Sequence, residues 1–153
     1  MKRPIALIAV LVLTAAMLAG LTAIASSATS KPATVKTGTS ALGRIVVDGK
    51  SHTLYLFQKD RHGKSACSGA CARSWPPLLT KGAPKAGTGA KSSLLGTTMR
   101  SDGTTQVTYN KHPLYTFVGD NGKPGSTAGQ GLDAFGARWY VVASKGTARI
   151  GRY

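Results

Sequence analysis

A nine-residue stretch occurs twice in the chain, as His52-Thr-Leu-Tyr-Leu-Phe-Gln-Lys-Asp60 and again as His112-Pro-Leu-Tyr-Thr-Phe-Val-Gly-Asp120. A shift of 60 residues aligns the two copies with identical residues at five positions, the His, Leu, Tyr, Phe and Asp. Internal duplication indicates two copies of one supersecondary unit, each too small to bury its apolar face alone. The repeat therefore predicts two units that pack together with pseudo-two-fold symmetry.

Turn and strand signals surround both copies. Asp48-Gly49 is a hairpin-turn dipeptide between the strand candidates 45–47 and 53–57. The second half repeats the device with strand candidates at 97–100, 104–109 and 113–117, and 138–144 supplies a last strand. The 19 glycines, the 7 prolines and the absence of glutamate fit turn-rich β structure rather than long helices. We expect an all-β domain at 42–145, built from two β-meander or hairpin units (about 43–80 and 97–143) with few or short helices; 81–93 is predicted as a surface loop.

The two ends of the chain carry different signals. Residues 1–25 show the three-part pattern of a secretory signal peptide, with Lys2-Arg3, an apolar run and a small-x-small site ending at Ala25. The run is also long enough to span a bilayer, so an uncleaved anchor remains the alternative. Residues 26–41 are small and polar and are predicted to be a flexible spacer, and 146–153 form a basic C-terminal tail.

The duplicated stretch resembles a known family. Tyr55-Leu-Phe57-Gln-Lys-Asp60 and Tyr115-Thr-Phe117-Val-Gly-Asp120 are similar to the Tyr-x-(aromatic)-x-x-Asp motif of a bacterial secreted and lipoprotein repeat of unknown function. The resemblance implies an extracytoplasmic protein but supplies no biochemistry to transfer. Members are often lipoproteins, whereas here Leu21 follows Leu-Ala-Gly in place of the lipid-bearing cysteine. We therefore expect a secreted, envelope-associated chain without a lipid anchor.

The only two cysteines, Cys67 and Cys71, are predicted to form a structural disulfide, because an exported chain meets an oxidising compartment. The alternative is an extracytoplasmic redox or metal-handling protein that uses these cysteines with the histidines. The spacing of His52, His62 and His112 matches no zinc pattern. We expect no metal and no cofactor.

The motif itself admits two interpretations. Asp60 and Asp120 fall in turn sequences, where an aspartate most often accepts hydrogen bonds from nearby backbone N–H groups. In the other interpretation the motif side chains of both copies converge on a ligand or cation; this candidate site comprises Tyr55, Phe57, Asp60, Tyr115, Phe117, Asp120, His52 and His112. We favour the structural interpretation because turn chemistry alone explains the aspartates. Trp75 and Trp139 are predicted to lie in the core.

Charge provides the remaining signal. The chain carries 20 Lys and Arg residues against 5 Asp, a formal net charge of +15. Such a charge attracts anionic polymers, with an attraction that salt screens. Lys59, Arg61 and Lys64, beside the first motif, are the predicted polyanion contacts.

We expect a secreted, non-catalytic cell-envelope module that binds or scaffolds, toward anionic envelope polymers, without specific nucleic-acid recognition and with membrane contact only through the signal segment. Serine-hydrolase and zinc-protease motifs are absent from the sequence. The predicted catalytic set is therefore empty. A small hydrolase using Asp60 and Asp120 is kept as an alternative.

Overall fold

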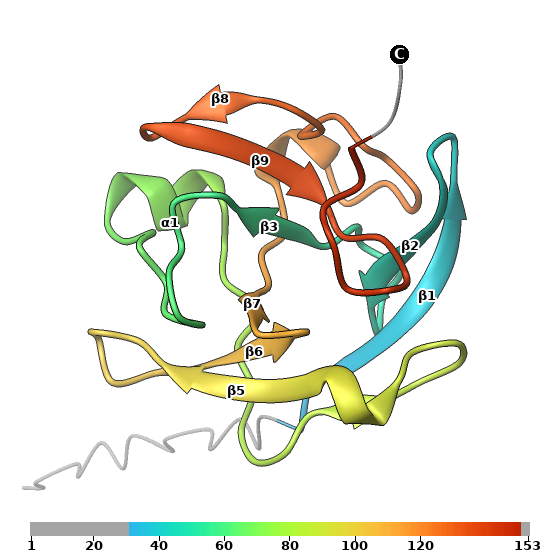
Figure 1. Cartoon of the computed structure of the whole chain (residues 1–153), viewed down its shortest axis with the longest axis horizontal. Helices are drawn as coiled ribbons and strands as arrows, with labels where there is room; N and C mark the ends of the chain where they lie inside the picture. The colour runs from blue at the N-terminus through green and yellow to red at the C-terminus, as the bar shows by residue number, and fades with distance from the viewer. Residues whose placement is uncertain (1–30, 151–153) are drawn as a thin grey trace, which may run out of the picture.

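Short strands separated by turns make up the domain, which a computed structural model describes for residues 31–150. The predicted signal peptide lies outside the described residues. The strands are β1 (Thr34–Ser40), β2 (Gly43–Asp48), β3 (Tyr55–Phe57), β4 (Lys85–Ala86), β5 (Leu95–Met99), β6 (Thr105–Tyr109), β7 (His112–Pro113), β8 (Asp133–Ala134) and β9 (Ala137–Val141). The helices are α1 (Ala70–Ser74) and the 3₁₀ turns η1 (Ser92–Leu94) and η2 (Val118–Asp120). Three small sheets result, with strand orders β2-β1-β4, β3-β9-β8 and β5-β6-β7 (Figure 1). The predicted all-β class is confirmed.

The two halves use equivalent hairpins. In the first, β1 pairs antiparallel with β2, and Thr37 lies opposite Val46. In the second, β5 pairs antiparallel with β6, and Thr97 lies opposite Val107. Each hairpin is followed by a tight turn into its motif strand, and the second turn places both Asn110 and Lys111 at positive φ (49° and 64°), as the hairpin-favouring primed turns require. The backbone therefore carries the duplication first seen in the sequence.

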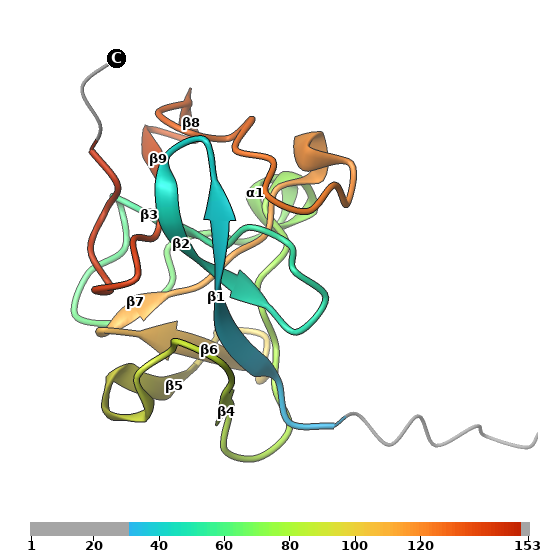
Figure 2. The same ribbon diagram turned by 90° about the vertical axis from the view of Figure 1, so that its right-hand side faces the viewer.

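The predicted spacer at 26–41 is wrong for 34–40, because these residues form β1. Val35 in this strand is fully buried and packs with Val46 and Leu54. Residues 34–40 contain a single large apolar side chain, so their low hydrophobicity is typical of a linker. Its signal is instead the β-branched content of Thr34-Val35-Lys-Thr37-Gly-Thr39, which favours an extended strand. β1 runs along the side of the domain, and the end of its hairpin with β2 lies at one edge (Figure 2).

The two repeats exchange strands. Thr116 in the second motif donates its N–H to the Pro76 carbonyl of the first repeat over 2.9 Å, and the backbone of Pro77 forms a β-bridge with that of Tyr115. In the equivalent place, β9 of the second repeat pairs with β3 of the first, with Val141 opposite Tyr55. Each motif strand is thus flanked by a segment of the other copy. The pairing of the two motif strands therefore depends on the other copy, although the sheet β5-β6-β7 lies within the second repeat.

Large aromatic side chains fill the space between the repeats. Phe57 stacks on Trp139, Trp139 stacks on Trp75, and Trp75 stacks on Phe117, with ring centroids 4.0, 4.0 and 4.1 Å apart. The column therefore alternates between first-repeat and second-repeat residues. Both tryptophans are fully buried, as predicted. A second apolar cluster includes Val107, Tyr109 and Leu114. It lies between β6 and those faces of β2 and β3 that point away from the aromatic column.

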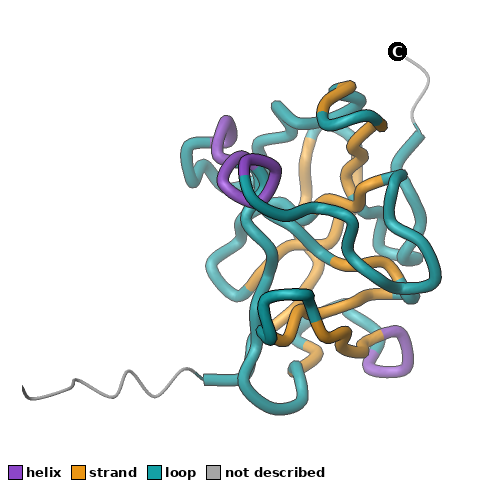
Figure 3. The backbone as a smooth tube through the Cα atoms, turned by 90° about the vertical axis from the view of Figure 1, so that its left-hand side faces the viewer, coloured by secondary structure: helices purple, strands orange, loops and turns teal. Residues whose placement is uncertain are grey.

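The chain after β9 folds back on that strand. The N–H of Ala143 donates to the Thr147 carbonyl over 2.8 Å, and the N–H of Arg149 donates to the Val141 carbonyl over 2.7 Å. The ordered domain therefore extends beyond the predicted limit at 145 and includes the first part of the predicted tail. Loops connect most of the strands (Figure 3). Among residues 31–150, no helix is long and apolar enough to cross a membrane.

Candidate functional site

The motif tyrosines and aspartates of the two repeats bond to each other in a crossed arrangement. The Tyr55 hydroxyl donates to Asp120 Oδ2 over 2.8 Å, and the Tyr115 hydroxyl hydrogen-bonds to Asp60 Oδ2 over 2.9 Å. Both tyrosines are fully buried. The side chains from the two copies therefore meet as two inter-repeat pairs, each composed of one tyrosine and one aspartate.

The remaining oxygen of each aspartate is also occupied. Asp60 Oδ1 accepts the N–H of Ala66 over 2.8 Å. Asp120 Oδ1 accepts the Ser126 hydroxyl over 2.7 Å and the N–H of Ala128 over 3.0 Å. These backbone bonds match the turn chemistry predicted for the two aspartates. Every oxygen of these two carboxylates therefore has a protein donor. Because the donors come from the opposite repeat and from the loop that follows the motif, each aspartate holds that loop against the opposite repeat.

Burial raises the pKa of Asp60 and of both motif tyrosines. Desolvation raises the pKa of Asp60 to about 6, against the lowering influence of its hydrogen bonds and of Arg100 and Arg61 nearby. Desolvation, reinforced by the partner aspartates, raises the pKa of Tyr55 and of Tyr115 well above the ordinary tyrosine value. Both tyrosines therefore stay protonated and able to donate throughout the physiological pH range.

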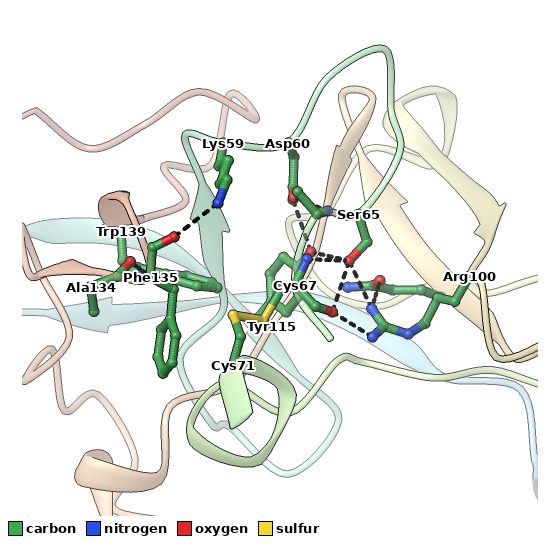
Figure 4. The surroundings of a disulfide bond; sticks show 12 residues. Lys59, Asp60, Ser65, Cys67, Cys71, Arg100, Tyr115, Ala134, Phe135 and Trp139 are labelled. Atoms are coloured by element: carbon green, nitrogen blue, oxygen red, sulfur yellow. Dashed lines mark hydrogen bonds between the residues drawn. A yellow bond between two sulfur atoms is a disulfide. The ribbon is translucent and has the colours of Figure 1, made fainter. Parts of the chain in front are cut away.

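A buried arginine that the sequence interpretation missed connects Asp60 to the disulfide loop. The Arg100 guanidinium donates to Gln106 Oε1 and to the Cys67 carbonyl, each over 2.7 Å, and to Ser65 Oγ over 2.9 Å. Ser65 Oγ in turn lies 2.8 Å from the Tyr115 hydroxyl (Figure 4). A basic residue beside a Ser-Asp-Gly turn is read as a solvated charge, so the sequence offered no signal for this network.

Cys67 and Cys71 are joined by a disulfide at the start of α1, as the sequence predicts. Their side chains are 1% and 6% exposed and pack in the cluster that contains Trp75 and Trp139. Figure 4 shows the disulfide next to the hairpin tip at Phe135. The bridge therefore lies under the protein surface, as part of the core.

The two motif histidines lie apart. His52 Nδ1 is 2.9 Å from Asp48 Oδ2, a pair that the sequence interpretation did not identify although both residues belong to one hairpin. His112 is half-buried, and desolvation lowers its pKa. His52 lines a pocket with Phe117 and Asp120, and His112 lines another with Phe57 and Asp60. Within the described residues, no group of three His, Cys, Asp or Glu side chains could hold a metal ion.

The predicted polyanion contacts are exposed and follow β3. Lys59 Nζ donates to the Phe135 carbonyl over 3.3 Å. Arg61 donates to the carbonyls of Gln58 and Asp60, which holds its guanidinium close to the end of the motif. Lys64 lies across the same turn from Arg61, and the backbones of the two residues form an isolated antiparallel β-bridge.

A family described as a secreted repeat of unknown function matches residues 36–79 and 96–143. The chain belongs to this family. The two matches begin in β1 and β5, which form equivalent hairpins, and end after the segments that the repeats exchange. Membership confirms the resemblance drawn from the motif and places the chain among secreted proteins. No curated protein and no solved structure matches the chain significantly.

Proposed function

We propose that this member of the secreted repeat family is a non-catalytic cell-envelope module that binds anionic polymers. The observation that carries the proposal is the distribution of charge between the interior and the surface. Asp48, Asp60 and Asp120 turn their carboxylates to internal hydrogen bonds, and within residues 31–150 only Asp102 and Asp133 are exposed carboxylates. In the same range the Lys and Arg residues are exposed, apart from the buried Arg100 and the half-buried Lys36. The solvent-facing field is therefore more basic than the composition alone suggests.

The architecture of the motif supports binding over catalysis. A general acid or nucleophile needs a carboxylate that can reach a substrate. Every oxygen of Asp60 and Asp120 is engaged by a protein donor, and Asp120 is 6% exposed. The buried disulfide likewise favours a structural over a redox role, because reactive thiols occupy accessible sites. The proposal includes a mature chain without lipid, since Leu21 stands where a lipid-bearing cysteine would be.

Binding of the purified exported protein to a poly(glycerol phosphate) polymer, measured by calorimetry against salt concentration, tests the proposal. We expect affinity to fall steeply as salt rises, because bound polymer releases counterions and the Debye length shrinks from about 10 Å at 0.1 M to about 3 Å at 1 M. Neutral dextran is the uncharged comparison. Absence of polymer binding at low salt would refute the proposed function.

A pair of charge-matched variants locates the contact. The triple substitution of Lys59, Arg61 and Lys64 by Gln should weaken polymer binding and reduce the salt dependence while leaving the unfolding temperature unchanged. The same change at Lys81, Lys85 and Lys91, all exposed in the segment between the repeats that contains β4, removes equal charge elsewhere. A larger loss from the second triple would place the contact at that segment. Mass analysis of the secreted chain should show no lipid and an N-terminus near Ser26.

A further inference from the structure

The duplication places a pocket at the same position in each repeat. The larger pocket, of about 560 Å³, includes Phe57, Gln58, Asp60, Arg61 and His112 in its lining. The smaller, of about 190 Å³, is lined in part by the second repeat's Phe117, Val118, Asp120 and Gly122, together with His52. The paired positions differ by 60 residues. In both cases the histidine of one repeat faces the end of the other repeat's motif.

The two pockets have diverged in chemistry. Gln58 in the larger pocket corresponds to Val118 in the smaller one, and Arg61 corresponds to Asn121. The hydroxyl residue Thr147, from the segment that folds back on β9, also lines the larger pocket. One copy therefore has an arginine, an amide and a hydroxyl around its histidine, whereas the other has a hydrophobic side chain where the amide would be and no arginine.

The larger pocket retains free donors. Arg61 uses one terminal nitrogen, NH1, to hold the Gln58 and Asp60 carbonyls, which fixes the guanidinium at the pocket wall. Across the described part of the chain, no hydrogen bond engages the other terminal nitrogen of Arg61 or the imidazole of His112. A guanidinium with a free edge and an imidazole that line one pocket are suited to an oxyanion, since both groups present N–H donors and the guanidinium is always charged.

Asp60 does not oppose an anion in this pocket as strongly as its formal charge suggests. Both of its oxygens accept internal hydrogen bonds, from Ala66 and Tyr115. The positive charges of Arg100 and Arg61 act on its carboxylate and partly offset its charge. The donors at the pocket wall are therefore available to an incoming group.

We propose that the larger pocket binds a single oxyanion group, phosphate or carboxylate, carried on a hydroxylated unit of the polymer. Arg61 and His112 hold the anionic group, and Gln58 and Thr147 contact the hydroxyls. The inference rests on the proposed function and deepens it, because it gives a polymer that is attracted by the general basic field one defined point of contact. The smaller pocket is a vestige of the duplication that lacks this capacity.

Small-molecule titration of the purified exported protein tests the inference. The probes are glycerol 1-phosphate and glucuronate, and glycerol is the neutral comparison. Binding is measured by calorimetry and by the shifts of the ring proton resonances of the three histidines. We expect a charged probe to shift the His112 resonances selectively. Arg61→Gln and His112→Gln should each weaken binding at least tenfold, a loss of about 1.4 kcal/mol. Tighter binding of one probe identifies phosphate or carboxylate as the natural group.

Matched variants guard against a general charge effect. Lys111→Gln removes a neighbouring exposed charge that does not line the pocket, and His52→Gln alters the equivalent histidine of the smaller pocket. Both should bind the probe within twofold of the wild type. Arg61 is exposed, so its variant stays informative even if His112→Gln unfolds. Equal losses in all four variants, or binding of neither probe, would overturn the inference. Salt-dependent polymer binding with no probe binding would leave the proposed function standing, and probe binding without polymer binding would remove that function alone.

Discussion

Tyr55 of the first repeat and Tyr115 of the second donate their backbone N–H groups to each other's carbonyls, over 2.8 Å and 3.0 Å. Their side chains then bond to the aspartate at the end of the opposite motif. The two copies of the motif thus meet at their tyrosines, and each tyrosine ties its own strand to the other copy's loop. The motif spacing Tyr-x-Phe-x-x-Asp follows from this: the tyrosine lies at the contact, the phenylalanine points to the same face two residues on, and the aspartate lies in the turn beyond the strand.

The crossed bonds predict a specific pattern of energetic coupling. Tyr55→Phe should lower the free energy of unfolding by about 1.5–3 kcal/mol, because it removes a hydrogen bond to a buried carboxylate. In a double-mutant cycle measured by urea unfolding, Tyr55→Phe should couple to Asp120→Asn by about 1 kcal/mol or more. The control cycle pairs Tyr55→Phe with Asp60→Asn in the same motif. Stronger coupling within a motif than between motifs would contradict the crossed arrangement.

Asp60 predicts a pH dependence of stability. The pKa of this carboxyl is raised from 3.8 to about 6 in the folded protein. Between these values the folded chain holds a proton that the unfolded chain releases, so the contribution of Asp60 to stability grows as pH falls from 6 toward 3.8 and is lost as pH rises. The side chain is partly solvated, which reduces the effect to about 1–2 kcal/mol.

The measurement compares urea unfolding of the wild type and of Asp60→Asn at pH 7.5 and pH 4.5. The stability of the wild type relative to the variant should increase at the lower pH. Asp133→Asn removes an exposed carboxylate and controls for the overall rise in positive charge. If the difference between the wild type and Asp60→Asn is constant with pH, the carboxyl is not perturbed by burial.

The sequence predicted the repeat, the hairpin turns and the buried tryptophans because these depend on local patterns. The exchange of strands between copies was out of reach for a physical reason. In the first repeat the exchanged segment contains Pro76-Pro77, which lacks two backbone N–H donors and reads as a break in a sheet, although its carbonyls still accept. The Arg100 network was missed because two of its partners, Ser65 and the Cys67 carbonyl, are 35 and 33 residues away in the sequence, in and beside the disulfide loop.

The role of β1 can be tested by truncation. A chain that begins at Ala41 lacks β1, which covers β2 along its whole length. We expect this chain to be unfolded by circular dichroism, whereas a chain that begins at Lys31 should fold. Val35→Ala should cost about 1–3 kcal/mol in urea unfolding, from lost burial and the cavity left behind, while Thr39→Ala at an exposed position of the same strand should cost under 0.5 kcal/mol. If the chain that begins at Ala41 folds, residues 34–40 are not needed for the fold and act as a spacer.

The disulfide gives the last prediction, because its loop is short but its position is central. Cys67 and Cys71 close a loop with a sequence separation of 4, for which the chain-entropy estimate is about 2 kcal/mol. The same loop presents the Cys67 carbonyl to Arg100 and supplies core contacts to Trp75, so opening it also loosens a buried charge network. The double variant Cys67→Ser, Cys71→Ser should therefore lose more than the loop estimate, about 3–4 kcal/mol in urea unfolding. In the variant Arg100→Gln the network is already broken, and the cost of opening the disulfide should return to about 2 kcal/mol.

Native protein should show no thiol that reacts with an alkylating reagent until it is both unfolded and reduced. Two reactive thiols in the unreduced native chain would show that the bridge is absent. An equal cost of the cysteine substitutions with and without Arg100 would show that the bridge and the arginine act independently.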